Sequence, residues 1–266
     1  MTSKTFLVHP GKAKNLCFVK IETDEGIYGW GECYTQSDRD VQITAHVDQL
    51  KRYLIGRDPT NIKHFTQMAF DDFAGRRGSM DYYCAISGLE HAMWDIAGKA
   101  YGAPVHKLIG GACRDKIRVY ANGWSGGNPT PDSLAERASE VIEAGFTALK
   151  FDPIPGRWRT YVSKDVERAA VENDSLPCTP SASPTKSEQY RPFWFEEPIL
   201  AENIPALASV RQKINIPVVT GEELYTKFEF REVFERQAAD ILNPDVCNVG
   251  GILELKEMRR WRSRTS

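Results

Sequence analysis

The chain has 266 residues, of which 41% are hydrophobic and 26% are charged, so it is long enough for one large domain or two ordinary ones with a buried core. Lys plus Arg number 34 and Asp plus Glu number 36, a balance that favours neither nucleic acid nor an acidic lipid surface as a partner. No apolar run approaches the roughly 18 residues of a membrane span, and the six cysteines include no Cys-x-x-Cys pair, so we expect a cytoplasmic protein with reduced thiols.

The first hundred residues predict an α+β unit. Residues 15–32 have the pattern of a β-hairpin, with a turn at Asp24-Glu25-Gly26. Apolar residues at helical spacing predict three helices, over 38–55, 60–73 and 82–101. We therefore expect a small sheet that is covered by a layer of helices.

From about residue 116 the pattern changes to strands that alternate with helices, which is typical of parallel βα units with right-handed crossovers. The predicted strands cover 117–120, 147–151, 192–195, 216–220 and 239–242. The predicted helices cover 132–144, 204–214 and 228–236, and a further helix starts at 252. Residues 174–187, rich in Pro, Ser and Thr, predict a linker or a disordered loop. Five strands are fewer than a closed (β/α)₈ barrel requires.

Polar residues follow three of these predicted strands. Lys150-Phe151-Asp152, Glu196-Glu197-Pro198 and Gly221-Glu222-Glu223 each stand where an apolar run ends. The carboxyl ends of neighbouring parallel strands meet at one rim, and carboxylates that converge there are hard-oxygen ligands suited to Mg²⁺. An acidic pair before proline is also an ordinary way to begin a loop, so each motif alone is weak evidence.

Longer stretches of the chain resemble the mandelate racemase/muconate-lactonizing branch of the enolase superfamily. The resemblance is carried by residues 85–99 with the Gly102-Ala103-Pro104 that follows, by the hairpin segment 26–32, and by Asn243-Pro244-Asp245 with the glycine pair 250–251. It implies an α/β protein with an α+β enolase-type capping domain over 1–115 and an incomplete (β/α)₈ TIM barrel over 116–266. In that barrel the third strand and the last two strands are expected to be missing, so the chain resembles a truncated copy.

Residues 150–161 and 220–231 are most similar to the acid-sugar dehydratases of that family, of the galactonate type. The resemblance implies a carbon–oxygen lyase (a hydro-lyase) that removes the proton α to a carboxylate through a metal-stabilised enediolate. It implies Mg²⁺ as cofactor, held by Glu196 and Glu222, and a small sugar acid as substrate. Family analogy also suggests a homo-oligomer, with neither nucleic acid nor membrane as partner.

The catalytic candidates implied by the resemblance are Lys150, Asp152 and Asp245. Lys150 matches the first Lys of a Lys-x-Lys motif, and Asp152 replaces the second, which is the base in racemase members of the family. Asp245 matches an aspartate that orients a catalytic histidine, yet all five histidines precede the barrel. Glu32 and Tyr34 fall where the family's specificity loop closes over substrate.

Each candidate also has an ordinary structural interpretation. Lys150 has the sequence context of a surface lysine with a buried stem, Asp152 of a helix cap or loop residue, and Asp245 of a turn residue. Glu32 and Tyr34 fit a solvated rim equally. The alternative for the whole chain is a catalytically inactive truncated remnant, or a structural partner of an intact paralogue, because an open barrel fragment exposes strand edges. A nucleotide-binding α/β protein is disfavoured, since no glycine-rich phosphate loop is present.

Overall fold

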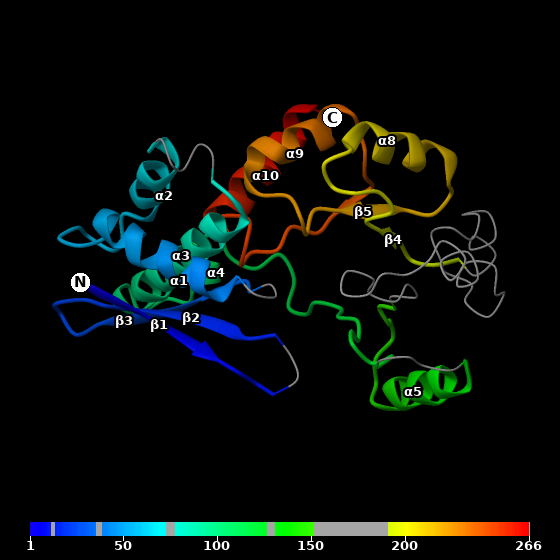
Figure 1. Ribbon diagram of the computed structural model, residues 1–266, viewed down its shortest axis with the longest axis horizontal. Helices are drawn as coiled ribbons and strands as arrows, with labels where there is room; N and C mark the ends of the chain where they lie inside the picture. The colour runs from blue at the N-terminus through cyan, green and yellow to red at the C-terminus, as the bar shows by residue number, and fades with distance from the viewer. Residues whose placement is uncertain (12–13, 36–38, 73–77, 127–130, 152–190, 266) are drawn as a thin grey trace.

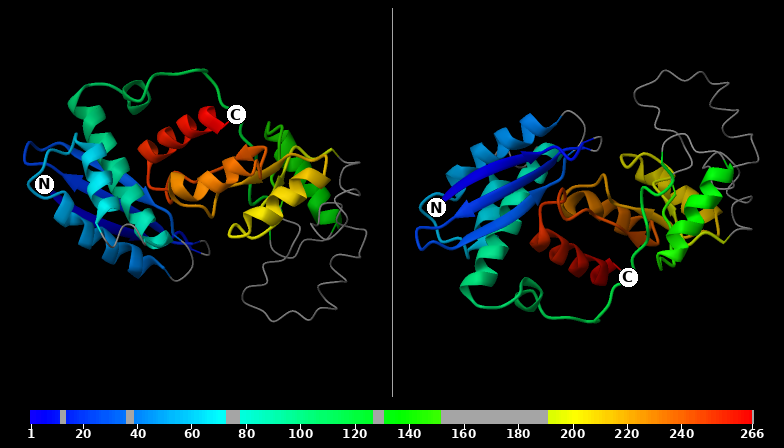
Figure 2. Two further views of the ribbon diagram at one scale, coloured as in Figure 1. Left: turned by 90° about the horizontal axis from the view of Figure 1, so that it is seen from above. Right: turned by 90° about the horizontal axis from the view of Figure 1, so that it is seen from below.

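The computed structural model describes residues 1–11, 14–35, 39–72, 78–126, 131–151 and 191–265. The antiparallel sheet and its helices lie at one end of the molecule and helix α5 (Pro131–Glu143) lies toward the other, with α9 (Thr226–Glu235) and α10 (Ile252–Thr265) between them (Figures 1 and 2). The residues expected to form a linker, 174–187, lie outside the described residues, as does Asp152. No helix in the described ranges has the length and apolar character that crossing a membrane requires.

The N-terminal sheet has three antiparallel strands in the order β1 (Thr2–Val8), β2 (Leu16–Glu22) and β3 (Tyr28–Cys33). The hairpin predicted over 15–32 is confirmed as β2 and β3. Strand β1 was not predicted, because its apolar residues Phe6, Leu7 and Val8 are consecutive and exposed and therefore give no period-two alternation.

Three helices cover one face of this sheet, as the sequence predicted; the first two are shorter than expected, and the third begins two residues earlier than expected and ends one residue earlier. They are α1 (Asp40–Leu50), which continues as a 3₁₀ turn over Lys51–Tyr53, α2 (Ile62–Asp71) and α3 (Met80–Ala100); the short α4 (Val105–Leu108) follows. Helix α3 is buried along most of its length because it lies between the sheet and the other helices (Figure 1). Its Leu89 and Met93 are part of a core that also contains Val19 of β2 and Phe65 of α2.

Glycines allow the backbones of β3 and α3 to approach closely. A Cβ placed on Gly29 would overlap the carbonyl oxygen of Ala92, and one on Gly31 would overlap that of Gly88. Gly88 has the reciprocal constraint, since its Cβ would overlap the Cys33 sulfur. The seam between strand and helix therefore has no room for any side chain at these positions.

The C-terminal part contains a parallel sheet with the order β4 (Phe195–Glu196), β5 (Val218–Thr220) and β6 (Ile241–Leu242). Helix α8 (Ile204–Lys213) connects β4 to β5, and α9 connects β5 to β6. A second core packs between this sheet and its helices around Leu207, Val218, Phe230 and Val233. The predicted βα alternation is thus confirmed from residue 195 onward, and the sheet is open in the described residues.

The prediction of strands at 117–120 and 147–151 is wrong, because neither segment forms a strand. The structure has only an isolated parallel bridge there, between Ala121 and Leu149, with α5 between the two segments in sequence. Ile117 is 76% exposed and Val119 is 62% exposed. Parallel strands depend on cover from both faces, and no described element supplies it here, so the apolar pattern does not produce a ladder.

A buried carboxylate joins the two parts of the molecule. Glu90 of α3 is fully buried and accepts hydrogen bonds from the backbone N–H groups of Ile252 and Leu253, both at 2.9 Å, at the first turn of α10. The indole of Trp94 donates to the same carboxylate at 2.7 Å. Beside it, the N–H of Gly250 donates to the hydroxyl of Ser87 at 3.0 Å. A carboxylate at a helix N-terminus satisfies backbone donors that lack partners within the helix.

Gly31→Ala tests the seam between β3 and α3. The new methyl overlaps backbone rather than a movable side chain, so we expect the free energy of unfolding to fall by about 2 kcal/mol or more in denaturant titrations. Gly26→Ala is the control: Gly26 has φ +79° and open space around it, and the left-handed backbone alone costs about 1 kcal/mol. Equal losses in the two variants would contradict the close approach of strand and helix.

Glu90 predicts a pH dependence of stability. Burial raises the pKa of its carboxyl to about 7, against the lowering effect of the three N–H donors. A carboxyl with a raised folded-state pKa stabilises the fold below the unfolded-state value and loses this contribution as pH rises through the folded-state value. We expect stability to decline by roughly 3 kcal/mol between pH 4.5 and 8 from this group. Glu90→Gln should remove this slope, whereas Glu140→Gln on the exposed side of α5 should keep it. An unchanged slope in Glu90→Gln would contradict the assignment.

Candidate active site

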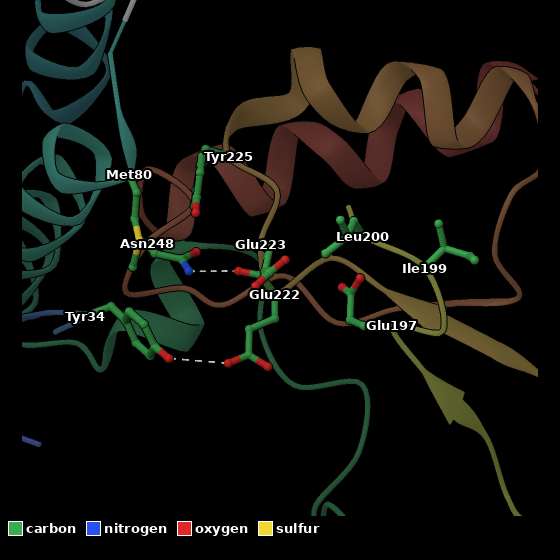
Figure 3. A pocket seen from close by; sticks show the side chains of 9 residues that line it. All are labelled: Tyr34, Met80, Glu197, Ile199, Leu200, Glu222, Glu223, Tyr225 and Asn248. Carbon is green, nitrogen blue, oxygen red and sulfur yellow. Dashed lines mark hydrogen bonds between the residues drawn. The ribbon is translucent and has the colours of Figure 1, made fainter. Parts of the chain in front are cut away.

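The ends of the parallel strands bring polar side chains together on the side of the sheet that faces the N-terminal part (Figure 3). Strand β4 ends at Glu196, and β5 is followed by Gly221 and Glu222. Strand β6 is followed by Asn243. Because all three strands run in one direction, their carboxyl ends meet at one edge, which is where open α/β sheets place ligand sites.

Glu196 is the centre of this group. The Lys150 ammonium donates to its Oε1 at 2.7 Å, and the Asn243 amide donates to the same oxygen at 2.9 Å. The Trp194 indole lies 3.3 Å from Oε2. The side chains of Lys150 and Glu196 are 26% and 13% exposed, so the ion pair is largely shielded from solvent.

The ion pair controls the protonation of Lys150. Burial by itself lowers the pKa of the ammonium, but the hydrogen bond and the negative charge of Glu196 outweigh burial and raise the pKa above its usual value. Lys150 is therefore a cation at neutral pH, held at the strand ends. It is placed there by the Ala121–Leu149 bridge and by a hydrogen bond of 2.6 Å from the Trp124 indole to its carbonyl oxygen.

Glu197 points to a different set of partners. Its carboxylate accepts from the Thr220 hydroxyl at 3.0 Å and from the Gly221 N–H at 2.8 Å. Burial raises the pKa of Glu197 in spite of these two donors. The carboxylate thereby fixes the backbone between β5 and Glu222.

Glu222 meets the N-terminal part of the molecule. The Tyr34 hydroxyl lies 3.4 Å from its Oε1, and the Asn248 amide donates to its carbonyl oxygen at 2.9 Å (Figure 3). Burial, with the nearby charges of Glu222 and Asp245, raises the pKa of Tyr34 to about 12, so the phenol is a neutral hydrogen-bond donor. The Tyr34 N–H also donates to the carbonyl oxygen of Cys247 at 3.0 Å.

A pocket of about 320 Å³ lies next to this contact. Its walls come from both parts of the molecule (Figure 3): Tyr34, Met80, Glu197, Ile199, Leu200, Glu222, Glu223, Tyr225 and Asn248. Burial, followed by the charges of Glu202 and Glu222, raises the pKa of Glu223. Three of the nine lining residues are glutamates, which makes the pocket rich in carboxyl oxygens.

The structure brings four of the predicted site residues together in two pairs. Lys150 meets Glu196, and Tyr34 meets Glu222. Asp245 receives the N–H of Cys247 at 2.7 Å, as a turn residue does. Burial, followed by the charges of Asp245 and Glu32, raises the pKa of Cys247 to about 12. Glu32 lies in β3, where it pairs with Phe18 of β2.

Asn243, Tyr225 and Asn248 were not predicted as site residues, and Glu197 and Glu223 were part of the predicted strand-end motifs but had no role assigned to them. Asn243 had a detectable signal, because it directly follows an apolar run, as Glu196 and Glu222 nearly do. The turn interpretation was made for Asp245, which follows Asn243-Pro244. Asn248 and Tyr225 had no such signal, since they become site residues only through packing between distant segments.

The candidate residues have the type of ligand atom that Mg²⁺ prefers, but they are too few to form a complete Mg²⁺ site. Glu196 and Glu222 carry carboxylate oxygens, the ligands that Mg²⁺ prefers. However, Oε1 of Glu196 already accepts from two nitrogen donors. In the part of the chain that the structure describes, no three His, Cys, Asp or Glu side chains gather closely enough to hold a metal ion.

Similarity to known proteins agrees with this architecture. Residues 6–110 match the N-terminal domain of mandelate racemase / muconate lactonizing enzyme, and residues 184–261 match the enolase C-terminal domain-like family. D-galactonate dehydratases from Verminephrobacter eiseniae and Ralstonia pickettii are 36% and 34% identical over 258 residues. Each alignment covers 89% of this chain and 66% of the relative, so the chain spans slightly less than two thirds of their length.

A solved structure extends the comparison to three dimensions. The mandelate racemase/muconate lactonizing enzyme-like protein from Roseovarius sp. superposes with a TM-score of 0.84 at 31% identity, over 99% of this chain and 76% of that one. An enolase-type N-terminal capping domain is thus followed here by part of the C-terminal domain. The chain belongs to the mandelate racemase/muconate lactonizing enzyme family of the enolase superfamily.

Proposed function

We propose that the chain carries part of the active site of a hydro-lyase that acts on a small sugar acid. The observation that supports this most is the contact of Lys150 with Glu196 at the strand ends, beside Glu222 and Tyr34. A fixed cation next to strand-end carboxylates suits a reaction in which negative charge develops on a substrate carboxylate. The galactonate dehydratases among the relatives supply the substrate class.

The chemistry follows from the acidity of the substrate. A proton α to a carboxylate is weakly acidic, so its removal depends on stabilising the enediolate, after which a β-hydroxyl group leaves with a proton. In this proposal Lys150 stabilises negative charge at the substrate carboxylate. Asp152, which follows the same segment, takes part in proton transfer, and Asp245 orients the groups around it. Tyr34 and Glu32 contact the substrate from the capping side.

Mg²⁺ is the proposed cofactor, with Glu196 and Glu222 as its ligands. When bound, a divalent cation would stabilise the negative charge of an enediolate. In the structure the Lys150 ammonium occupies the cationic position next to Glu196. A metal would therefore compete with Lys150 for Oε1 of Glu196, and a further ligand must come from outside the described residues or from solvent.

A second candidate function is a catalytically inactive remnant or a structural partner of an intact paralogue. Two observations on the described residues favour it: they gather no set of three metal-ligating side chains, and none of their strands pairs with the outer edges of β4 and β6. Open edges recruit further strands. Such a chain would bind neither metal nor sugar acid in a saturable manner.

The remaining parts of the proposal concern the organisation of the chain. We infer a boundary between the capping domain, 1–115, and a domain of (β/α)₈ TIM-barrel type, 116–266. We infer a cytoplasmic role in the breakdown of carbohydrate acids, and a homo-oligomer by analogy with the family. The antiparallel and parallel sheets on either side of the proposed boundary support the division.

Titration with Mg²⁺, followed by incubation with galactonate and related sugar acids, separates the two functions. An active lyase should bind Mg²⁺ saturably in calorimetry and form a 2-keto-3-deoxy acid, detected by mass spectrometry as loss of one water. Glu196→Gln should abolish both signals, because it removes a charged ligand. Absence of binding and turnover in a soluble, folded sample would leave the inactive remnant as the function.

Lys150→Met tests the competition at Glu196. Removal of the ammonium frees Oε1 of Glu196, so Mg²⁺ affinity should rise several-fold, equivalent to about 1 kcal/mol for a largely shielded ion pair. Turnover should fall at the same time, because the stabilising cation is lost. Lys213→Met, on the exposed end of α8, is the control and should alter neither quantity. A Mg²⁺ affinity that is unchanged in Lys150→Met would show that the metal does not bind at Glu196.

A further inference from the structure

Two cysteines lie directly opposite each other in the N-terminal sheet. Cys17 of β2 pairs with Cys33 of β3 in the antiparallel register, so both side chains lie on the same face of the sheet. Helix α3 covers that face: the two cysteines are 0% and 1% exposed, and a Cβ on Gly88 of α3 would overlap the Cys33 sulfur. Neither cysteine forms a disulfide in the structure. The packing of α3 against the sheet therefore holds two thiols side by side.

The register puts these two cysteines within reach of a disulfide bond. Directly opposite residues of an antiparallel pair have Cα atoms about 4.5 or 5.5 Å apart, and disulfides span Cα separations of roughly 4.4–6.8 Å. The Cβ atoms of such a pair are about 4.5–5.5 Å apart, whereas a disulfide needs roughly 3.5–4.5 Å. Closing the bond would thus draw β2 and β3 together locally, and a strained disulfide is easily reduced again.

The two thiols differ in acidity. The Cys33 thiol donates a hydrogen bond to the Cys17 sulfur, and this bond lowers the pKa of Cys17 against the effects of burial and of the carboxylates of Asp40 and Glu32. The same bond, together with burial, raises the pKa of Cys33. Since the thiolate is the nucleophile in thiol chemistry, Cys17 is the reactive member of the pair, and Cys33 is placed to attack its oxidised form.

Two further cysteines lie near the pair but lack these properties. Cys84 of α3 is fully buried, and Cys247 follows β6 in the C-terminal part. Burial raises the pKa of Cys84, and it raises the pKa of Cys247 to about 12. Neither stands opposite another cysteine in the ladders of the described residues. Both are therefore suited as comparisons within the same region.

The position of the pair at the end of the sheet gives a small oxidant a route to it. Cys17 and Cys33 form the last rung of the β2–β3 ladder, because β3 ends at Cys33. Beyond this rung, the hydroxyl of Thr35 donates to the carbonyl oxygen of Asn15. The end of a ladder opens locally at a low free-energy cost. Breaking the contact between Thr35 and Asn15 would therefore expose the two sulfurs.

We propose that Cys17 and Cys33 form a reversible disulfide across β2 and β3 when the chain meets hydrogen peroxide. The Cys17 thiolate attacks one peroxide oxygen, the O–O bond breaks, and Cys17 becomes a sulfenic acid while hydroxide leaves and takes up the proton that Cys17 had released. The Cys33 sulfur then attacks the Cys17 sulfur and displaces water. Two thiols and one hydrogen peroxide thus give one disulfide and two waters.

This modification site goes beyond the proposed lyase function. It uses no side chain of the candidate active site, although Tyr34 directly follows Cys33 in the chain. A thiol such as glutathione reverses the reaction by attack on the disulfide. The site requires neither Mg²⁺ nor a sugar acid.

Treatment of the folded full chain with hydrogen peroxide tests the proposal. After the remaining thiols have been alkylated, trypsin should release peptides 15–20 and 21–39, which contain Cys17 and Cys33, as one disulfide-linked species in mass spectrometry. Reduced glutathione should separate the two peptides again. Cys17→Ala should abolish the linked species, whereas Cys84→Ala, at an equally buried cysteine, should leave its yield unchanged.

A second pair of variants tests the route of the oxidant. Thr35→Val removes the hydroxyl that closes the end of the sheet and should speed disulfide formation several-fold, because local opening becomes easier. Thr44→Val removes a hydroxyl bond within α1 and should leave the rate unchanged. Equal rates in these two variants would contradict the route. Absence of the linked peptides from the folded chain, their formation in denaturant alone, or equal yields in Cys17→Ala and Cys84→Ala would overturn the proposal.

Discussion

The hydrogen bonds between Glu90 and the start of α10 hold together the two parts on which the candidate site depends. The carboxylate comes from the central helix of the capping domain, and its backbone partners, Ile252 and Leu253, come from the opposite part of the molecule. Burial opposes ionisation of this group while the N–H donors favour it, so the contact is a balance between desolvation and hydrogen bonding. Together with the Gly250–Ser87 and Tyr34–Cys247 hydrogen bonds, this contact holds Tyr34 close to Glu222. Part of the geometry of the site is therefore set by contacts outside it.

Within the C-terminal part, a short parallel sheet is sufficient to gather the site residues. Each strand has two or three residues, yet the shared direction places Glu196 and Asn243 within hydrogen-bonding distance. Lys150 joins them from a segment that contributes a single bridge, to Ala121, and no strand. The position of the Lys150 ammonium therefore depends more on side-chain contacts than on backbone hydrogen bonds between strands. Such an arrangement tolerates a change of partner, because the lysine stem is flexible and the guiding interaction is electrostatic.

Much of this organisation could be predicted from the sequence, and the failures have identifiable causes. The β2–β3 hairpin and helix α3 were predicted because alternation and helical periodicity are local signals. Strand β1 was missed because its apolar residues are consecutive, and 117–120 was called a strand because apolar content was read without knowledge of what covers it. The rim position of Glu196 and Glu222 followed from strand-end motifs. Lys150 and Tyr34 were also candidates, but their pairing with Glu196 and Glu222 could not be predicted, because contacts across 46 and 188 residues are decided by tertiary packing.

The glycine seam between β3 and α3 limits how this capping domain can change in evolution. At most core contacts a larger residue on one side is accommodated by a smaller residue on the other. Gly29, Gly31 and Gly88 already bear the smallest side chain available, and what faces the two strand glycines is main chain. No second substitution can restore the lost space, so drift at these positions has no compensating route. We therefore expect the glycines of this seam to be retained while the surface residues around them diverge.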